Sequence, residues 1–215
     1  MEQKNFSLRL KGKTAVLIDW ANVHGWSSSL KKEVDPQKLF DYLKTYSQIK
    51  DISLYFGQDK NPKSEKFLNE MKQIGFRVVT KEVKYIPVSL DTSHFNSLYK
   101  EIKESLSTVR NLGVNEVEKI LAVLNRKVLR RKCDFDIEIA MDVYKFLDQY
   151  NTFTFFSGDG DFAPLLNFLA GKGKQVIVIF AEGHLGKEVS KLGRRVFLCN
   201  IKNIPPVLRP RGVIG

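Results

Sequence analysis

Short apolar runs alternate with stretches of helical periodicity along most of the chain. Residues 14–19 form a continuous apolar run that ends in an aspartate, which predicts a strand buried in a parallel sheet. An Asp-Pro pair at 35–36 then opens a helical repeat, because aspartate caps a helix and proline suits its first turn. The predicted strands are residues 14–19, 52–56, 76–80, 152–157, 175–180 and 196–199, and the predicted helices are residues 35–46, 62–74, 136–150, 162–170 and 186–192.

This order of elements predicts an α/β fold with a mostly parallel central sheet and right-handed crossovers. The alternation is interrupted between residues 84 and 132, where we find no clear strand and two stretches of helical periodicity. We interpret that segment as a helical insertion. The expected organisation is one domain over residues 12–200, with the insertion at 84–132, followed by an irregular tail at 201–215 that is rich in proline.

The composition of the chain indicates what kind of binding partner and which cellular location to expect. The net charge of +11, from 35 basic and 24 acidic residues, favours a polyanionic partner. Five of the seven residues at 126–132 are basic, and they form either a phosphate-contact patch or a solvated helix face. No apolar run reaches the roughly 18 residues that span a bilayer, and the first 13 residues lack the apolar stretch of a signal peptide. We therefore expect a cytoplasmic protein that does not engage a membrane.

Several kinds of site are disfavoured by the residues present. The two cysteines are far apart, and no two of the three histidines stand at ligand spacing, so a disulfide framework or a zinc site is not supported. The glycine-rich motifs GxGxxG and GxxxxGK[ST] are absent, which disfavours a nucleotide cofactor. Any metal would have to be held by oxygen ligands.

Acidic residues follow two of the predicted strands and open one helix. Asp19 ends the first strand with Asn22 close behind it, Asp159 and Asp161 follow the strand at 152–157, and Asp136 begins the helix before that strand. The carboxyl ends of parallel strands meet at one edge of a sheet, so these carboxylates are expected to converge there. A divalent cation would offset their repulsion, and an all-oxygen site suits Mg²⁺ or Mn²⁺, which can activate a water and polarise a phosphoryl oxygen.

Each of these residues also has a simpler interpretation. Asp161 or Asp136 can serve as a helix cap, and Asn22 can be a turn residue. A capping or turn role is a weaker explanation for Asp19, because a carboxylate after an apolar strand is costly in free energy unless it is paired or metal-bound. On the helix, Asp136 and Asp142 lie roughly 240° apart around the axis, so both cannot face one ion equally. We favour Asp136, at the exposed start of the helix, and place Asp142 second as an outer acid.

Three segments together resemble the NYN domains, in particular the LabA-like branch of the PIN-like nuclease superfamily. They are Leu17-Ile18-Asp19-x-x-Asn22, Asp136 to Asp142, and Ser157-Gly158-Asp159-Gly160-Asp161-Phe162. The resemblance implies a three-layer α/β/α PIN-like sandwich and a Mg²⁺- or Mn²⁺-dependent ribonuclease. Its acidic site would be Asp19, Asp136, Asp159 and Asp161, with Asn22 beside the first. Many relatives have Lys-Gly just before the helix acid, whereas Lys132-Cys133-Asp134-Phe135 precedes it here, so Asp134 remains an alternative to Asp136.

Three functions follow from these observations. The leading hypothesis is an endoribonuclease that acts on single-stranded or structured RNA, with a homodimer as the assembly considered. The second is a non-catalytic RNA-binding or regulatory scaffold, in which the basic run and the aromatic side chains of Trp20 and Trp26 contact nucleotides. The third is a small-molecule phosphohydrolase, which is disfavoured because Ala21 stands where a haloacid-dehalogenase-type site would need a second aspartate.

Overall fold

The computed structural model describes residues 7–87, 96–109, 112–127 and 129–210. The chain divides into two units, one made of Met1–Glu82 with Asp134–Gly215 and the other of Val83–Cys133. The larger unit contains the central sheet and the candidate acidic residues. Among the described residues, no helix is both long and apolar enough to cross a membrane.

The larger unit is built on a six-stranded parallel sheet of order β4-β3-β1-β7-β8-β9. From β1 the chain moves outward through β3 to β4, and from β7 it moves in the opposite direction through β8 to β9. The strand order therefore reverses between β1 and β7, which is where open α/β sheets form ligand crevices. The strands are β1 Thr14–Asp19, β3 Ile49–Tyr55, β4 Arg77–Val79, β7 Thr152–Phe156, β8 Gln175–Phe180 and β9 Phe197–Asn200.

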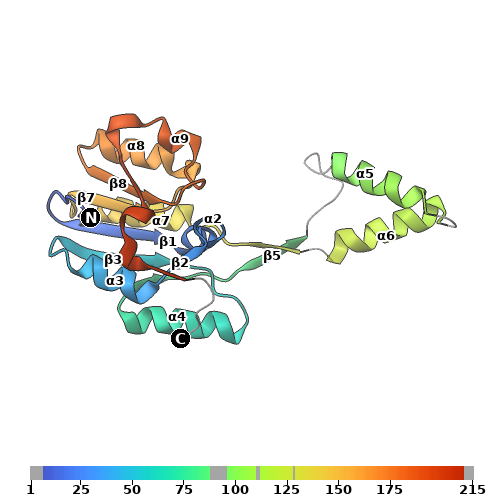
Figure 1. Cartoon of the computed structure of the whole chain (residues 1–215), viewed down its shortest axis with the longest axis horizontal. Helices are drawn as coiled ribbons and strands as arrows, with labels where there is room; N and C mark the ends of the chain where they lie inside the picture. The colour runs from blue at the N-terminus through green and yellow to red at the C-terminus, as the bar shows by residue number, and fades with distance from the viewer. Residues whose placement is uncertain (1–6, 88–95, 110–111, 128, 211–215) are drawn as a thin grey trace. The chain divides into compact units, whose positions relative to one another are not determined.

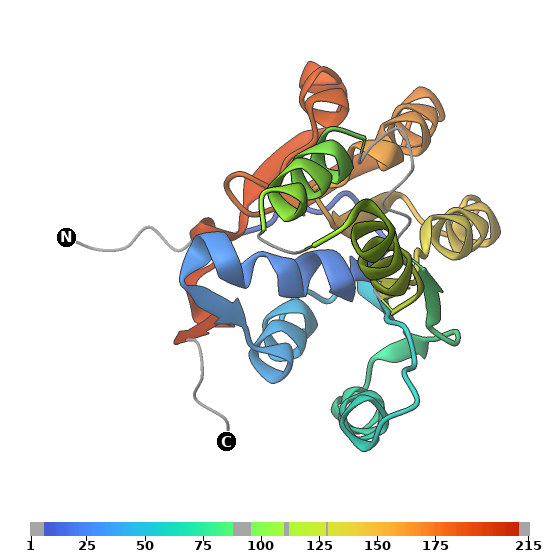
Figure 2. The same ribbon diagram turned by 90° about the vertical axis from the view of Figure 1, so that its right-hand side faces the viewer.

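Helices cover both faces of this sheet, which confirms the predicted three-layer α/β/α fold. Helices α3 and α4 lie on one side of the sheet, and α7, α8 and α9 lie on the other (Figures 1 and 2). Right-handed crossovers require this arrangement, since the two halves of the sheet are wound in opposite directions. The helices are α1 Trp20–Gly25, α2 Ser27–Leu30, α3 Pro36–Lys44, α4 Pro62–Ile74, α7 Asp136–Phe146, α8 Ala163–Gly171 and α9 Lys187–Ser190.

Local sequence sets the ends of the helices that it predicted. The Asp35 carboxylate accepts a hydrogen bond from the backbone N–H of Lys38 at 3.0 Å, and Pro36 occupies the first turn of α3. Helix α4 ends at Gly75, whose φ of 115° is a left-handed conformation that favours glycine. The short elements α1, α2 and β2 (Lys32–Val34) were not predicted, because they are too brief to show a hydrophobic period.

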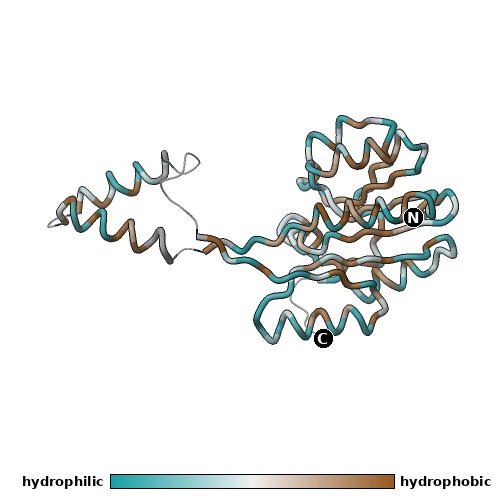
Figure 3. Tube along the Cα trace, turned by 180° about the vertical axis from the view of Figure 1, so that it is seen from behind, coloured by the Kyte–Doolittle hydropathy of each residue, from teal (hydrophilic) through white to brown (hydrophobic). Residues whose placement is uncertain are grey.

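The core is a sheet buried on both faces, and its strands are the most hydrophobic part of the larger unit (Figure 3). Val16 and Ile18 pack on the face covered by α3 and α4, in one cluster with Leu39, Leu43 and Met71. Alternate residues of the strands point to the other face. The continuous apolar runs of β1, β7 and β8 follow from this burial on both sides.

The C-terminal segment corrects the irregular tail expected for residues 201–215. Residues Ile201–Asn203 and Pro205–Val207 form 3-10 turns, and β10 (Leu208–Pro210) pairs antiparallel with β2. Ile201, Ile204 and Val207 are buried in the main core cluster. The prolines suggested an irregular segment, but proline is tolerated in an edge strand such as β10. Residues 211–215 lie outside the described residues.

The insertion also differs in part from its prediction. Two helices are present, α5 (Asn96–Ser107) and α6 (Val114–Lys127), and Glu118 of α6 bonds Lys103 and Tyr99 of α5. The segment was expected to contain no strand, yet β5 (Lys84–Pro87) and β6 (Leu129–Lys132) pair antiparallel. Three of the four residues of β6 are basic, so the sequence shows no alternation of apolar and polar residues that would predict a strand.

The packed C-terminal segment generates a prediction about stability. Ile204→Ala should lower the free energy of unfolding by about 2–4 kcal/mol, because it removes a fully buried side chain. Urea denaturation followed by circular dichroism measures this change. The exposed Lys202→Ala variant is the control and should stay within about 0.5 kcal/mol of the parent chain. Equal stability of both variants would show that the segment is not packed in solution.

Candidate functional site

The predicted acidic residues lie around the point where the strand order reverses. Asp19 is the last residue of β1, and Asp159 and Asp161 follow β7, the strand that neighbours β1. Asp136 is the first residue of α7. The charges of Asp136 and Asp159 act on Asp19, and those of Asp159 and Asp161 act on Asp136. The fold therefore brings four carboxylates from three separate segments into one electrostatic neighbourhood.

Asp19 is the most strongly perturbed of these carboxylates. Burial raises the pKa of Asp19 to about 6, and repulsion by Asp136 and Asp159 adds to the effect of burial. A hydrogen bond from the backbone N–H of Asn22, at 3.2 Å, acts in the opposite direction and makes Asp19 the N-cap of α1. The side chain is thus both a cap and a partly buried acid among like charges.

Asp136 has the same kind of environment in a weaker form. Burial raises the pKa of Asp136, and the charges of Asp159, Asp134 and Asp161 raise it further, while Lys81 lowers it. The side chain is half-buried, whereas Asp134 is exposed. Asp136 is therefore better placed than Asp134 to share a ligand with Asp19.

The loop after β7 divides its two acids between different roles. Asp159 accepts a hydrogen bond from the backbone N–H of Asp161 at 3.0 Å and caps the 3-10 turn Gly160–Phe162. The simple interpretation of Asp161 as a helix cap is not supported, because Phe162 occupies the N-cap position of α8. Asp161 is exposed beside the other acids, where its carboxylate is accessible to a ligand.

Close backbone contacts explain Gly158 in the acidic loop and Gly186 in the segment that the loop packs against. A side chain at Gly158 would overlap the carbonyl oxygen of His184, and the Gly158 carbonyl accepts a hydrogen bond from the N–H of Gly186 at 2.7 Å. A side chain at Gly186 would meet the backbone of Gly160. Glycine is thus required at these positions so that the acidic loop can pack against residues 184–186. The sequence alone did not reveal the partner segment.

Asn22 connects α1, the helix that follows Asp19, to the acidic loop after β7. Its side-chain oxygen accepts hydrogen bonds from Nε1 of Trp26 at 2.9 Å and from the backbone N–H of Gly158 at 3.2 Å. Both partners are donors only, so the oxygen must face them and the amide NH₂ is the group left to donate to a ligand. The expected stacking of Trp20 and Trp26 on nucleotides is wrong, because both side chains are buried in the core.

Asp142 is held in an ion network and is not part of the acidic neighbourhood. Its Oδ2 accepts hydrogen bonds from Arg77 at 2.6 Å and from the Tyr55 hydroxyl at 2.8 Å. Burial acts to raise the pKa of Asp142, but these bonds outweigh it and hold the pKa below its ordinary value. The network ties α7 to β3 and β4, so the role proposed for Asp142 as an outer acid gives way to one of anchoring the helix.

Lys81 is a residue of this region that sequence reasoning missed. Its ammonium group contacts both carboxylate oxygens of Glu138, at 2.7 and 2.8 Å, and lies 4.8 Å from the ring centroid of Phe135. It also lowers the pKa of Asp136 by its charge. Nothing in the local sequence distinguishes Lys81 among the 35 basic residues of the chain. Only the packing of α7 beside residue 81 brings this lysine close to Asp136 and Glu138.

The donor set fits a hard divalent cation. The acids that influence one another would offer carboxylate oxygens, and no histidine or cysteine is among the groups that shift the pKa of Asp19 or Asp136. Among the described residues, no group of three or more acidic, histidine or cysteine side chains is already drawn together at metal-binding distances.

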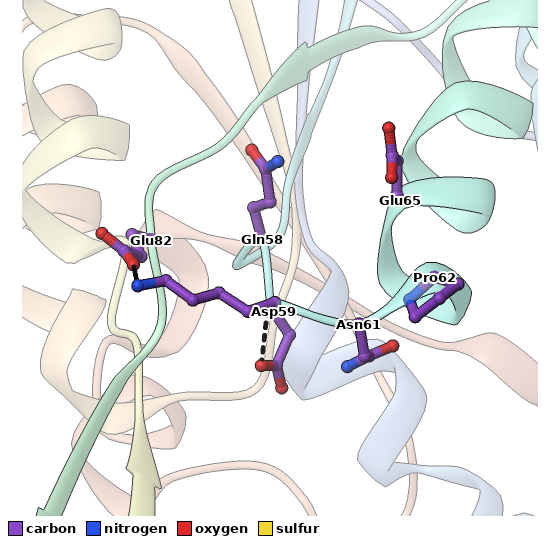
Figure 4. Close-up of a pocket in the computed structure, with 7 residues that line it drawn as sticks. Gln58, Asp59, Asn61, Pro62, Glu65 and Glu82 are labelled. Atoms are coloured by element: carbon purple, nitrogen blue, oxygen red, sulfur yellow. Dashed lines mark hydrogen bonds and ion pairs between the residues drawn. The ribbon is translucent and has the colours of Figure 1, made fainter.

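Two hollows lie near the ends of the strands. One of about 550 Å³ is lined by Asp161 together with Gly160, Ala163, Pro164, Asn167, Glu188 and Leu192, so it adjoins the acidic loop. The other, of about 470 Å³, lies between the end of β3 and the start of α4 (Figure 4). An ion pair of 2.6 Å between Lys60 and Glu82 spans its side, and it contains none of the candidate acids. The first hollow is therefore the one relevant to the site.

The raised pKa of Asp19 predicts that its charge destabilises the fold. The folded state holds the Asp19 proton up to about pH 6, so stability falls as the pH rises from about 4 to 6 and stays lower above it. Asp19→Asn should therefore increase the free energy of unfolding at pH 7.5 by roughly 2–3 kcal/mol, since asparagine also keeps the helix cap. At pH 4 the gain should be small.

Urea denaturation in EDTA at both pH values measures the effect of Asp19→Asn. The exposed Asp148→Asn variant removes the same charge outside the acidic neighbourhood and should change stability by less than about 0.5 kcal/mol. A loss of stability in Asp19→Asn at pH 7.5 would contradict the electrostatic account.

Comparison with known proteins agrees with this fold and this set of motifs. The model of the NYN domain family matches residues 13–106 and 95–196. The low amplitude and bright protein LabA of Synechococcus elongatus is 22% identical over 183 residues, which cover 81% of this chain and 77% of LabA. A crystal structure of a protein of unknown function from Vibrio parahaemolyticus matches with a TM-score of 0.59 at 17% identity, covering 95% of this chain and all of the other.

The structural match supports the fold alone, whereas the family match extends over most of the chain and includes the three acidic segments. The expected resemblance is therefore confirmed, and the chain belongs to the NYN domain family, whose fold is of the PIN-like nuclease type.

Proposed function

We propose that this protein is a metal-dependent ribonuclease that hydrolyses RNA phosphodiester bonds at the acidic site. The observation that supports this most is the environment of Asp19, a partly buried carboxylate whose pKa is raised by burial and by two other acids. Such an arrangement costs folding stability and has no structural benefit beyond one helix cap. Perturbed acids gathered at the reversal point of an α/β sheet are typical of a site that binds a cation and substrate.

Asp19, Asp136, Asp159 and Asp161 would hold the ion, Mg²⁺ or Mn²⁺. When bound, such an ion supplies Lewis acidity toward a phosphoryl oxygen and lowers the pKa of a water. Asp19 is ionised above about pH 6 and so is ready as a ligand at neutral pH. The amide NH₂ of Asn22 donates a hydrogen bond to a phosphate oxygen, because its carbonyl oxygen is already used.

The two other functions considered are less well supported. The scaffold hypothesis loses the proposed stacking of nucleotides on Trp20 and Trp26, because both side chains are buried, and it keeps only the basic run at 126–132. A phosphohydrolase of the haloacid-dehalogenase type would need a second aspartate two positions after Asp19. That position is Ala21, an exposed residue of α1. Neither alternative explains why Asp136 and Asp159 lie near Asp19. RNA as the substrate is supported by the family and by the net charge of +11.

Loss of one central carboxylate should abolish cleavage without unfolding the protein. Asp19→Asn and Asp136→Asn should each reduce the rate of cleavage of labelled RNA in Mn²⁺ by about 10²-fold or more, which corresponds to about 3 kcal/mol of transition-state stabilisation. Mn²⁺ should raise the melting temperature of the parent chain and not that of Asp19→Asn. Asp148→Asn is the matched control and should cleave normally. RNA that stays intact with the parent chain in Mn²⁺ and Mg²⁺ would refute the proposal.

The assignment of the helix ligand has a test of its own. Asp134→Asn should retain most of the cleavage rate, because Asp134 is exposed and acts only on Asp136 through its charge. The measurement compares single-turnover rates of Asp134→Asn and Asp136→Asn at equal Mn²⁺ concentrations. If Asp134→Asn were the more damaging change, the ligand role would move to Asp134.

A further inference from the structure

The insertion carries a disproportionate share of the positive charge. Residues 83–133 contain ten basic and five acidic residues, so they supply +5 of the net +11 from less than a quarter of the chain. Within the insertion, α5 and α6 use acids to bind bases, as Glu118 does with Lys103. The excess therefore belongs mainly to the segment 126–132 and to Lys84, which faces it across the strand pair.

The two strands of the insertion form a ribbon that has basic residues and no acidic ones. We define the basic ribbon as β5 (Lys84–Pro87) with β6 (Leu129–Lys132). In its register Lys84 lies opposite Lys132, and Tyr85 lies opposite Arg131. Like charges directly opposite one another destabilise an antiparallel pair, and a two-stranded ribbon is marginal even without them. A ribbon with several cations and no acidic residue is suited to bind a polyanion.

Strand alternation distributes these side chains over both faces of the ribbon. Lys84 and Lys132 lie on one face, and Tyr85 and Arg131 lie on the other. The side chains of both lysines and of Arg131 are exposed, and half of the surface of Tyr85 is accessible. An exposed aromatic ring beside cations provides a stacking surface for an unpaired base and contacts for the phosphates on either side.

We propose that the basic ribbon binds single-stranded RNA, with its cations on the phosphates and Tyr85 stacked on a base. The choice of RNA rests on the proposed function. An acidic lipid surface fits less well, because the exposed apolar side chains of the ribbon are divided between its two faces, with Tyr85 and Leu129 on one and Ile86 on the other. In sequence, Lys84 follows Lys81 by three positions and Lys132 precedes Asp136 by four.

The test measures RNA binding by the full chain in EDTA, where metal-dependent cleavage is silent. Fluorescence anisotropy with a labelled single strand of about 12 nucleotides gives the affinity at several salt concentrations. The double variant Lys84→Gln/Lys132→Gln removes two phosphate contacts, so it should reduce the salt slope by about 1.4 and weaken binding about 20-fold at 0.1 M salt. Tyr85→Ala should weaken binding about fivefold or more.

The matched control is Lys63→Gln/Lys72→Gln, which removes the same charge from exposed positions on α4 and should keep the parent salt slope. Equal RNA affinity of the ribbon variants and the control would overturn the proposal. So would binding to phosphatidylserine vesicles that depends on the two lysines while RNA binding does not. A chain that binds RNA through the ribbon but never cleaves it in Mn²⁺ would contradict the ribonuclease proposal and leave this one standing.

Discussion

Repulsion between carboxylates held at the reversal point of the sheet is the constraint on which the candidate site depends. Asp19 ends a strand buried on both faces, so its side chain is partly buried wherever the chain turns next. The fold then places Asp136 and Asp159 close enough to raise its pKa. A protein selected for stability alone would avoid this grouping, since neutral residues could cap α1 equally well. The proposed ribonuclease function would account for the grouping, since it requires a cation and an anionic substrate at this place.

Much of the surrounding structure serves to hold the acids where they are. Asn22 joins the start of α1 to the loop after β7, and the glycines of that loop let it pack against the segment at 184–186. Asp142 anchors α7 to β3 and β4 through Tyr55 and Arg77. Asp136 is the first residue of the same helix. The candidate acids thus lie at or next to the ends of strands and a helix, an arrangement that would limit the loss of entropy on binding a ligand.

Some site residues could be predicted from the sequence and others could not. The difference is whether a local pattern or a contact between distant segments places the residue in the site. Asp19, Asp136, Asp159 and Asp161 stand at the ends of predicted elements, so local pattern and strand order were enough to group them. Lys81 and the packing partner of Gly158 depend on contacts between segments distant in the sequence, and no local pattern reports those. Trp20 and Trp26 were misjudged because an aromatic residue near an acid has the same local pattern whether its ring faces the core or the solvent.

The sequence by itself determined the α/β class, the parallel sheet, the acidic residues and the family, because buried strands and capped helices leave strong periodic signals over short distances. Only the tertiary structure decided which acids remain available. It paired Asp142 with Arg77, used the Asn22 oxygen to join α1 to the loop after β7, and packed the C-terminal segment on the core. It also paired β5 with the mainly basic strand β6, a pairing that no local pattern in either strand predicts. These outcomes depend on contacts between side chains that are distant in the sequence, and the packing of the whole unit determines those contacts.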